Sequence, residues 1–286
     1  MATPEEFAAA GVRSISNPHC TATAMDLGAT VLSWRPAGDD EVLFVSRDAA
    51  VGEGLEIHGG IPICAPWFGQ GRDEVEVPAP HGLVRWVPWQ LSSQSEDEHG
   101  TRLVWELEAV DVAHLPGAEN YPSDLWFRYE ANFGRDLTVR FTVGSPTTEF
   151  VLDEALHTYF AVPGGGARIL GLDGTQMRDH TVSPPVSRST DGDPELPAAL
   201  NAVHRHSGEV ALVGPDRTIR IRSGKAASIV VWNPGPDVPP AFAADEWDQM
   251  VCIEVGNVQR DAVTVLAGGS HTMVMTISVE ARSATA

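Results

Sequence analysis

One histidine lies in the middle of a segment that alternates like a β-strand, VLDEALHTYF (151–160). Successive side chains of a strand point to opposite faces, so His157 shares a face with Tyr159 and points away from Leu156 and Phe160. A histidine in this setting can serve as a general acid or base, because its unperturbed pKa lies near neutral pH. The alternative is a structural histidine whose hydrogen bonds are satisfied inside the protein.

A glutamate lies in the middle of a second strand-like segment, MVCIEVGNV (250–258). The alternation puts Glu254 on one face with the small residues Cys252 and Gly256, which leave room for a ligand beside the carboxylate. The alternative is a solvated strand residue, since exposed carboxylates are the norm. Taken together, His157 and Glu254 predict an acid and a base that serve one site.

Two stiff, glycine-rich segments supply candidate binding residues, HGGIPICAPWFGQG (58–71) and PAPHGLVRWVPW (78–89). Glycine lets the backbone approach a ligand closely, aromatic rings suit the apolar faces of sugars, and His and Arg suit hydroxyls and phosphates. For Trp67 and Phe68 the alternative is core packing, and for Arg85 the alternative is a surface cation. The candidates in and beside these segments are His58, Trp67, Phe68, Arg72, His81 and Arg85.

Strands must position these residues, because period-two alternation dominates the chain. Short helices are expected only near 4–11 and 243–250, and 181–200 is expected to be an irregular surface loop. The fold class predicted from this pattern is all-β, a large antiparallel β-sandwich formed by residues 1–286 as a single domain. The strand-like segments are 41–46, 101–110, 125–133, 136–145, 167–174, 218–223, 227–233, 250–258 and 271–280.

The composition excludes several classes of partner. The formal net charge of −20 disfavours nucleic acid and anionic membrane surfaces, both of which need a basic face. No apolar run is long enough to span a membrane, and the N-terminal segment lacks the features of a signal peptide. Three widely spaced cysteines favour neither a zinc site nor a disulfide framework, so a cytoplasmic location is expected.

Five motifs occur in a recognisable order: GGIPICAPWFG, HGLVRWVPW, LHTYF, VVWNP and MVCIEVGNV. Their order and spacing resemble the aldose 1-epimerase (mutarotase) superfamily, and most of all its glucose-6-phosphate 1-epimerase branch, over roughly residues 20–280. The resemblance implies a mutarotase-like β-supersandwich that interconverts the anomers of an aldohexose, most of all glucose 6-phosphate. It implies no cofactor, no metal and a monomer whose partner is a small sugar or sugar phosphate.

The resemblance also assigns residues to roles. It implies that His157 in LHTYF is the catalytic histidine and that Glu254 in CIEVGNV is the catalytic glutamate. His81 and Arg85 match the substrate-binding positions of the HG-x-x-R motif, and Asp179 falls where the family carries a substrate-contacting aspartate.

One departure from the family pattern concerns the phosphate. The family reads Arg-Gly-Gly-Ile-Pro where this chain has His58-Gly59-Gly60-Ile61-Pro62. Histidine is shorter, is only partly charged near pH 7 and cannot make a bidentate fork, so weaker discrimination for a phosphorylated sugar is expected. Arg85 and Arg72 then remain as anion contacts. Two alternatives stay open, a mutarotase of an unphosphorylated sugar and a non-catalytic carbohydrate-binding module.

Overall fold

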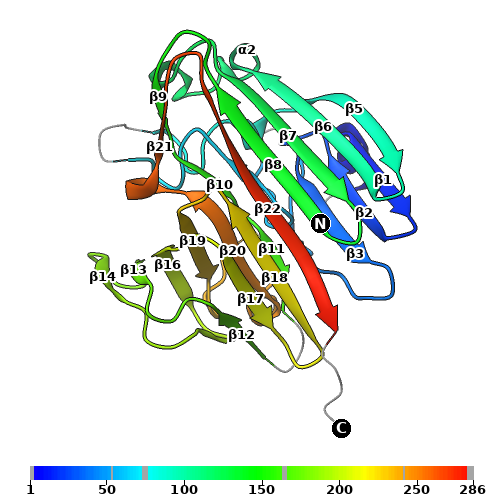
Figure 1. The fold of residues 1–286 in the computed structure, drawn as a ribbon, viewed down its shortest axis with the longest axis vertical. Helices are drawn as coiled ribbons and strands as arrows, with labels where there is room; N and C mark the ends of the chain where they lie inside the picture. The colour runs from blue at the N-terminus through cyan, green and yellow to red at the C-terminus, as the bar shows by residue number, and fades with distance from the viewer. Residues whose placement is uncertain (1–2, 53, 73–76, 163–165, 241, 282–286) are drawn as a thin grey trace.

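The computed structural model describes residues 3–52, 54–72, 77–162, 166–240 and 242–281 (Figure 1). Strands are the main regular element of this part of the chain, and every ladder between its named strands is antiparallel. The predicted all-β class, with large antiparallel sheets, is confirmed. No helix within the described ranges is both long and apolar enough to cross a membrane.

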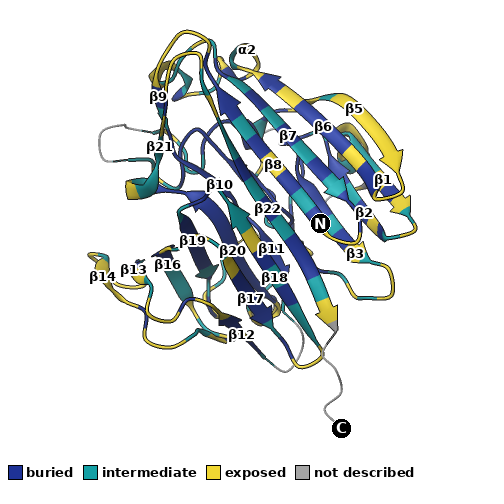
Figure 2. Cartoon of the chain, viewed as in Figure 1, coloured by how far each residue is buried: buried dark blue, intermediate teal, exposed yellow. Residues whose placement is uncertain are grey.

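The largest sheet has nine strands among the described residues. The strand at one edge of the sheet, β5, is largely exposed. The next strands in the sheet, β6 and β7, have both buried and more exposed side chains (Figure 2). From edge to edge the sheet contains β15 (Glu195–Leu196), β12 (Ala167–Leu170), β17 (Glu209–Val213), β18 (Arg217–Gly224), β22 (Ser270–Ala281), β8 (Leu137–Gly144), β7 (Trp126–Phe133), β6 (Gly100–Glu108) and β5 (Gln90–Asp97).

The second large sheet contains the strands that the sequence analysis singled out for chemistry. One of its interior strands, β20, is buried along its whole length, as a strand covered on both faces must be. The sheet contains, in order, β14 (Val186–Ser189), β13 (Gln176–Asp179), β16 (Leu200–Arg205), β19 (Ser228–Asn233), β20 (Met250–Asn257), β10 (Glu154–Leu156) and β4 (Ile63–Cys64), with β11 (Tyr159–Ala161) also paired to β20.

Smaller elements complete the described fold. Two of the short helices occur where they were expected: Thr3 caps α1 (Pro4–Ala9), and one 3-10 turn, η3 (Trp247–Gln249), lies within 243–250. The other elements are the three-stranded sheet β1 (Val12–Asn17), β2 (Cys20–Met25) and β3 (Val31–Pro36), the pair β9 (Phe150–Leu152) and β21 (Val263–Val265), and the short helices α2 (Ala109–Val112), η1 (Val84–Trp86), η2 (Ala118–Asn120) and η4 (Gln259–Asp261).

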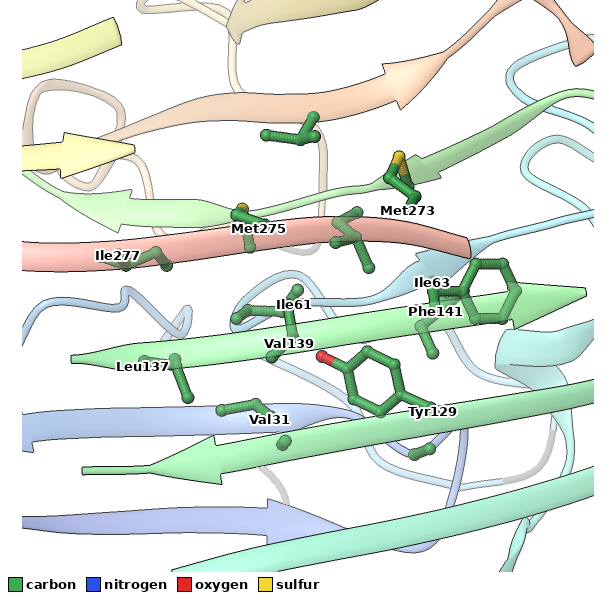
Figure 3. Close-up of a cluster of buried hydrophobic side chains, with 14 of the residues drawn as sticks. Val31, Ile61, Ile63, Tyr129, Leu137, Val139, Phe141, Met273, Met275 and Ile277 are labelled. Atoms are coloured by element: carbon green, nitrogen blue, oxygen red, sulfur yellow. The ribbon is translucent and has the colours of Figure 1, made fainter. Parts of the chain in front are cut away.

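A continuous apolar core joins these sheets. Figure 3 shows side chains of β7, β8 and β22 meeting Val31, Ile61 and Ile63, and all belong to one cluster of fully buried residues. Burying apolar surface contributes roughly 25 cal/mol per Å², so this cluster supplies the main stabilising term of the fold. The odd-numbered residues of β20, Val251, Ile253 and Val255, belong to the same core, which leaves the even-numbered face of that strand for other uses.

Two sequence predictions about loops and strands are wrong. Segment 181–200, expected to be irregular, contains β14 and β15, which pair with β13 and β12. Segment 41–46, expected to be a strand, makes only the isolated bridges of Leu43 and Val45. In both cases strand formation depends on whether a partner edge is available, which local alternation does not reveal.

Candidate active site

The face of β20 that carries Glu254 continues across four strands as a row of directly paired residues. Glu254 lies opposite Val230, Val230 opposite Val203, and Val203 opposite Arg178. Residues directly opposite each other in a sheet point to the same face, so these four side chains share one surface. The pairing thus lines up the glutamate of β20 with an arginine of β13.

A second row, two residues along each strand, lies on the same face. Tyr159 is opposite Cys252, Cys252 opposite Trp232, and Trp232 opposite Asn201. Most residues of the two rows line a cavity of about 500 Å³, which is large enough for a small ligand; the exceptions are Arg178 and Cys252. The loop residues Phe68 and His81 and the irregular segment at His157 supply further parts of its wall.

The cavity is unusual in its charged groups. Four histidines and two glutamates line it, but among the residues that the structure describes it has no lining arginine or lysine. Burial disfavours charge on the histidines, whose pKa values are all lowered. These lining residues are His58, His81, His157, His180, Glu56 and Glu254.

His157 and Glu254 are brought together as the sequence predicted. The His157 Nε2 atom lies 3.6 Å from the Glu254 Oε1 atom, which is longer than a hydrogen bond. Glu254 is 1% exposed and His157 is 7% exposed, and both line the cavity. The His157 Nδ1 and Glu254 Oε2 atoms are among the buried side-chain polar atoms that have no hydrogen-bond partner within the described residues.

Burial acts on both members of this pair. It raises the pKa of Glu254 well above its usual value, and the nearby Arg85 guanidinium partly opposes that rise. It lowers the pKa of His157 well below its usual value, and the positive charge of Arg85 lowers it further. The cavity therefore favours the uncharged form of each side chain, a protonated Glu254 and a neutral His157.

The His81–Gly82 turn aims an imidazole at this pair. Both residues have positive φ, and a Cβ atom on Gly82 would lie 2.0 Å from the Ala65 carbonyl oxygen, so only glycine fits there. The His81 Nδ1 atom accepts from the Gly69 backbone N–H at 3.3 Å, and burial lowers the pKa of His81 to about 3. The neutral ring therefore carries its proton on Nε2, and its edge packs against the His157 ring with centroids 5.1 Å apart.

His58 and Glu56 form another part of the wall. The His58 ring packs on Phe242 with centroids 4.9 Å apart, and its Nε2 atom lies 4.0 Å from Glu56 Oε2. Glu56 in turn holds Arg85, whose side chain is 3% exposed, through an ion pair of 2.9 Å. Burial lowers the pKa of His58, so this histidine is largely neutral at pH 7. The partial charge expected for it from the sequence is thus reduced by its surroundings.

Comparison with known proteins agrees with this geometry. The aldose 1-epimerase family model matches residues 12–278, almost the entire chain. The chain belongs to the aldose 1-epimerase family. The resemblance seen in the five motifs is confirmed, and the family assigns an epimerase activity on a small-molecule sugar.

Individual relatives place the chain within that family. It is 32% identical over 248 residues to an Escherichia coli K12 protein and 28% identical over 247 residues to one from Salmonella typhimurium; each alignment covers 84% of this chain and 81% of the relative. Both relatives bear the name "Putative glucose-6-phosphate 1-epimerase". A crystal structure described as a putative mutarotase from Salmonella typhimurium superimposes with a TM-score of 0.83 at 26% identity, covering 95% of this chain and 90% of that one.

Four residues expected in the site lie outside the cavity lining of this epimerase fold. Trp67 is a core residue, stacked on Tyr121 with its Nε1–H donating to the Ala79 carbonyl oxygen. Arg72 borders a separate hollow beside Tyr121. Arg85 is engaged by Glu56 behind the wall.

Asp179 is the fourth expected residue that lies outside the cavity lining. It points to the opposite face of β13 from Arg178, where it accepts from the Thr181 hydroxyl at 2.6 Å and pairs with Arg188 at 2.8 Å. The Thr181 and Arg188 contacts hold its pKa at about 2, as expected for a structural carboxylate. Its neighbour His180 lines the cavity instead.

Several lining residues were not identified from the sequence, although the chain carried a signal for some of them. Trp232 and Tyr159 lie in two of the five motifs, VVWNP and LHTYF, on the same strand face as the catalytic candidates. Glu56 precedes the His58 loop without any regular pattern, so only the folded chain reveals its contact with Arg85. His180, Asn201 and Gln259 likewise follow no regular pattern in the sequence, and only the folded chain shows that they line the cavity.

Proposed function

We propose that this protein interconverts the α and β anomers of an aldohexose, glucose 6-phosphate first among them, by acid–base opening and closure of the sugar ring. The observation that carries the proposal is the buried His157–Glu254 pair, which faces a sugar-sized cavity with one unpartnered polar atom on each side chain. Anomer exchange requires an acid and a base within reach of one hemiacetal, and this pair provides both.

The two side chains divide the proton transfers between two sugar oxygens. Glu254 takes the proton of the C1 hydroxyl while His157, in its protonated form, gives a proton to the ring oxygen. The bond between C1 and the ring oxygen then breaks and leaves an aldehyde at C1. Rotation about the C1–C2 bond presents the other face of the aldehyde, and the ring closes as both protons return along the same paths.

The surroundings of the pair suit this cycle. In the open-chain state Glu254 is protonated and His157 is neutral, which is the charge state that burial favours for both groups. The ring-opened intermediate therefore forms without leaving an isolated buried charge. Each residue acting in this way contributes on the order of 10²–10⁴-fold to the rate.

The phosphorylated substrate is supported by the names of the relatives at 28% and 32% identity. A second candidate is an uncharged aldohexose such as glucose or galactose. It is favoured by one observation: no arginine or lysine lines the cavity in the described part of the chain, and the nearest buried arginine, Arg85, is already paired with Glu56. A dianionic phosphate needs a cationic partner when it leaves water.

Anomer-exchange rates for glucose, galactose and glucose 6-phosphate test both candidates in one experiment. Freshly dissolved α-anomers are followed by polarimetry, or exchange between anomers is followed by NMR at equilibrium. We expect acceleration of at least one sugar by the wild-type protein. Sugar binding measured by calorimetry without any acceleration would instead identify a non-catalytic carbohydrate-binding module.

A further inference from the structure

A second, smaller cleft adjoins the catalytic cavity. Its volume is about 190 Å³, and it shares Val203 and Gln259 with the cavity, so the two hollows meet at these side chains. Three arginines line the cleft: Arg178, Arg205 and Arg260.

The concentration of positive charge is notable in so acidic a chain. The sequence has 19 lysines and arginines against 39 aspartates and glutamates, yet three of those arginines meet here. A single acidic side chain, Asp261, belongs to the lining, and it pairs with Arg205 at 3.1 Å. Arg178 and Arg260 form no ion pair with any residue that the structure describes. The cleft therefore has a local positive charge that its own carboxylate does not neutralise.

The register of the sheet sets the distance between this charge and the catalytic pair. Arg178, Val203, Val230 and Glu254 lie in one row across four neighbouring strands. Strands are spaced about 4.8 Å apart, so the Cα atoms of Arg178 and Glu254 are roughly 14 Å apart. A phosphorylated pyranose and a long arginine side chain together span such a distance. Arg178 is also close enough to the cavity for its charge to lower the pKa of His180.

Gln259 marks the boundary between the two hollows and is held firmly in place. It has a positive φ of 55°, uncommon for a residue other than glycine, and its backbone N–H donates to the buried Asp153 carboxylate at 3.3 Å. Its side chain lines both hollows. A ligand that extends from one hollow into the other would pass Gln259, which adds an amide donor beside the arginines.

We propose that the cleft lined by Arg178, Arg205 and Arg260 binds the phosphate group of a sugar whose C1 atom lies between His157 and Glu254. The inference rests on the proposed function for the position of the sugar ring. It answers the difficulty that the cavity itself has no lining arginine or lysine among the described residues. Arginine forks match phosphate oxygens in geometry and charge, whereas Arg85 is occupied by an internal carboxylate.

The test is the binding of glucose 6-phosphate to the whole protein, measured by calorimetry at low salt. The variants are Arg178→Gln and Arg260→Gln, and the control is Arg140→Gln, which removes the same charge from an exposed position on β8. A hydrogen bond to a charged group is worth a factor of about ten to a hundred. We expect each cleft variant to weaken binding by that factor and the control to bind like wild type. Raising the salt concentration should weaken wild-type binding.

Anomer exchange separates this inference from the proposed function. In the cleft variants, the loss of kcat/KM for glucose 6-phosphate should exceed the loss for glucose by about ten- to a hundredfold. Unchanged calorimetric affinity in both cleft variants, equal losses in the Arg140→Gln control, or a wild-type protein that does not bind glucose 6-phosphate would overturn the inference. A wild-type protein that binds glucose 6-phosphate through these arginines but accelerates no sugar would support the cleft and defeat the epimerase proposal.

Discussion

Two buried glutamates of the described residues each lie beside a histidine, and the two pairs differ in what surrounds them. The first is Glu254 with His157, and the second is Glu154 with His271, separated by 3.2 Å. Both glutamates are almost completely buried, and each keeps one carboxylate oxygen without a partner. Only the first pair lines the 500 Å³ cavity.

The second pair is closed in by other polar groups. Asn257 donates to the Glu154 carboxylate at 2.9 Å, and the His271 Nε2 atom also lies 3.1 Å from the Lys225 carbonyl oxygen. The hydrogen bond to Glu154 raises the pKa of His271, whereas burial lowers that of His157. A buried glutamate paired with a histidine is therefore common to both places in this fold. The difference lies in contact with a cavity and in an environment that leaves the histidine easy to deprotonate.

The largest expected effect is on the anomer-exchange rate, which should depend strongly on His157 and little on His271. His157→Gln should reduce the anomer-exchange rate by about 10²–10⁴-fold, because it removes the group that exchanges a proton with the ring oxygen. His271→Gln should stay within a few-fold of wild type. Polarimetry on both variants, with circular dichroism to establish that each is folded, measures the contrast. Comparable losses in the two variants would mean that the pairs do not differ in function.

A second effect separates the histidines by stability. Because its folded pKa is raised, His271 stabilises the protein fully below its unfolded pKa of about 6.5, and that contribution is lost as the pH rises through the folded value. Wild type should exceed His271→Gln by at most about 3 kcal/mol in unfolding free energy at pH 6, and by less at pH 9. Thermal melts of both proteins at the two pH values give the difference. A difference in unfolding free energy that is larger at pH 9 than at pH 6 would contradict this prediction.

A smaller effect concerns the positive charge of Arg85, which lies near the His157–Glu254 pair. Arg85 opposes the burial-driven rise in the pKa of Glu254, so Arg85→Gln should raise that pKa further. The acidic limb of the kcat/KM profile should then move to higher pH, because more of the base is protonated at a given pH. Glu56→Gln, which leaves Arg85 in place, should cause no upward movement. If both variants move the limb upward, loss of the ion pair rather than loss of the positive charge is responsible.

The smallest effect is expected at His58. His58→Arg would place a guanidinium in a cavity wall that has no lining arginine or lysine within the described residues. Glu56 lies only 4.0 Å from the His58 ring and would pair with the new cation. We therefore expect the preference for glucose 6-phosphate over glucose, measured as the ratio of kcat/KM values, to rise by less than about tenfold. A rise of a hundredfold would show that the wall at His58, rather than the arginine cleft, selects the phosphate.

Much of this site could be predicted from the sequence because strand alternation is a local property. The alternating pattern placed His157 and Tyr159 on one face and Glu254 on the polar face of β20, as the structure shows. The order of the motifs then indicated the family. The single-domain organisation and the roles of the individual site residues remain predictions.

The remaining residues depend on contacts that the sequence does not encode locally. Asp179 and His180 are adjacent and both polar, and only the register of β13 against β16 decides which of them faces the cavity. Trp67 and Phe68 are also adjacent, and one joins the core while the other lines the cavity. Arg85 looked available for a substrate until the structure showed Glu56 beside it.

The most direct test of the central claim is the anomer-exchange rate of Glu254→Gln measured beside that of Glu154→Gln. Both changes replace a buried carboxylate by an amide of the same shape, so they differ only in which pair they alter. NMR exchange spectroscopy on glucose and on glucose 6-phosphate, with matched protein concentrations, gives both rates under one set of conditions. We predict that Glu254→Gln loses about 10²–10⁴-fold in rate while Glu154→Gln retains near wild-type exchange. A folded Glu254→Gln protein that exchanges anomers at the wild-type rate would contradict the account.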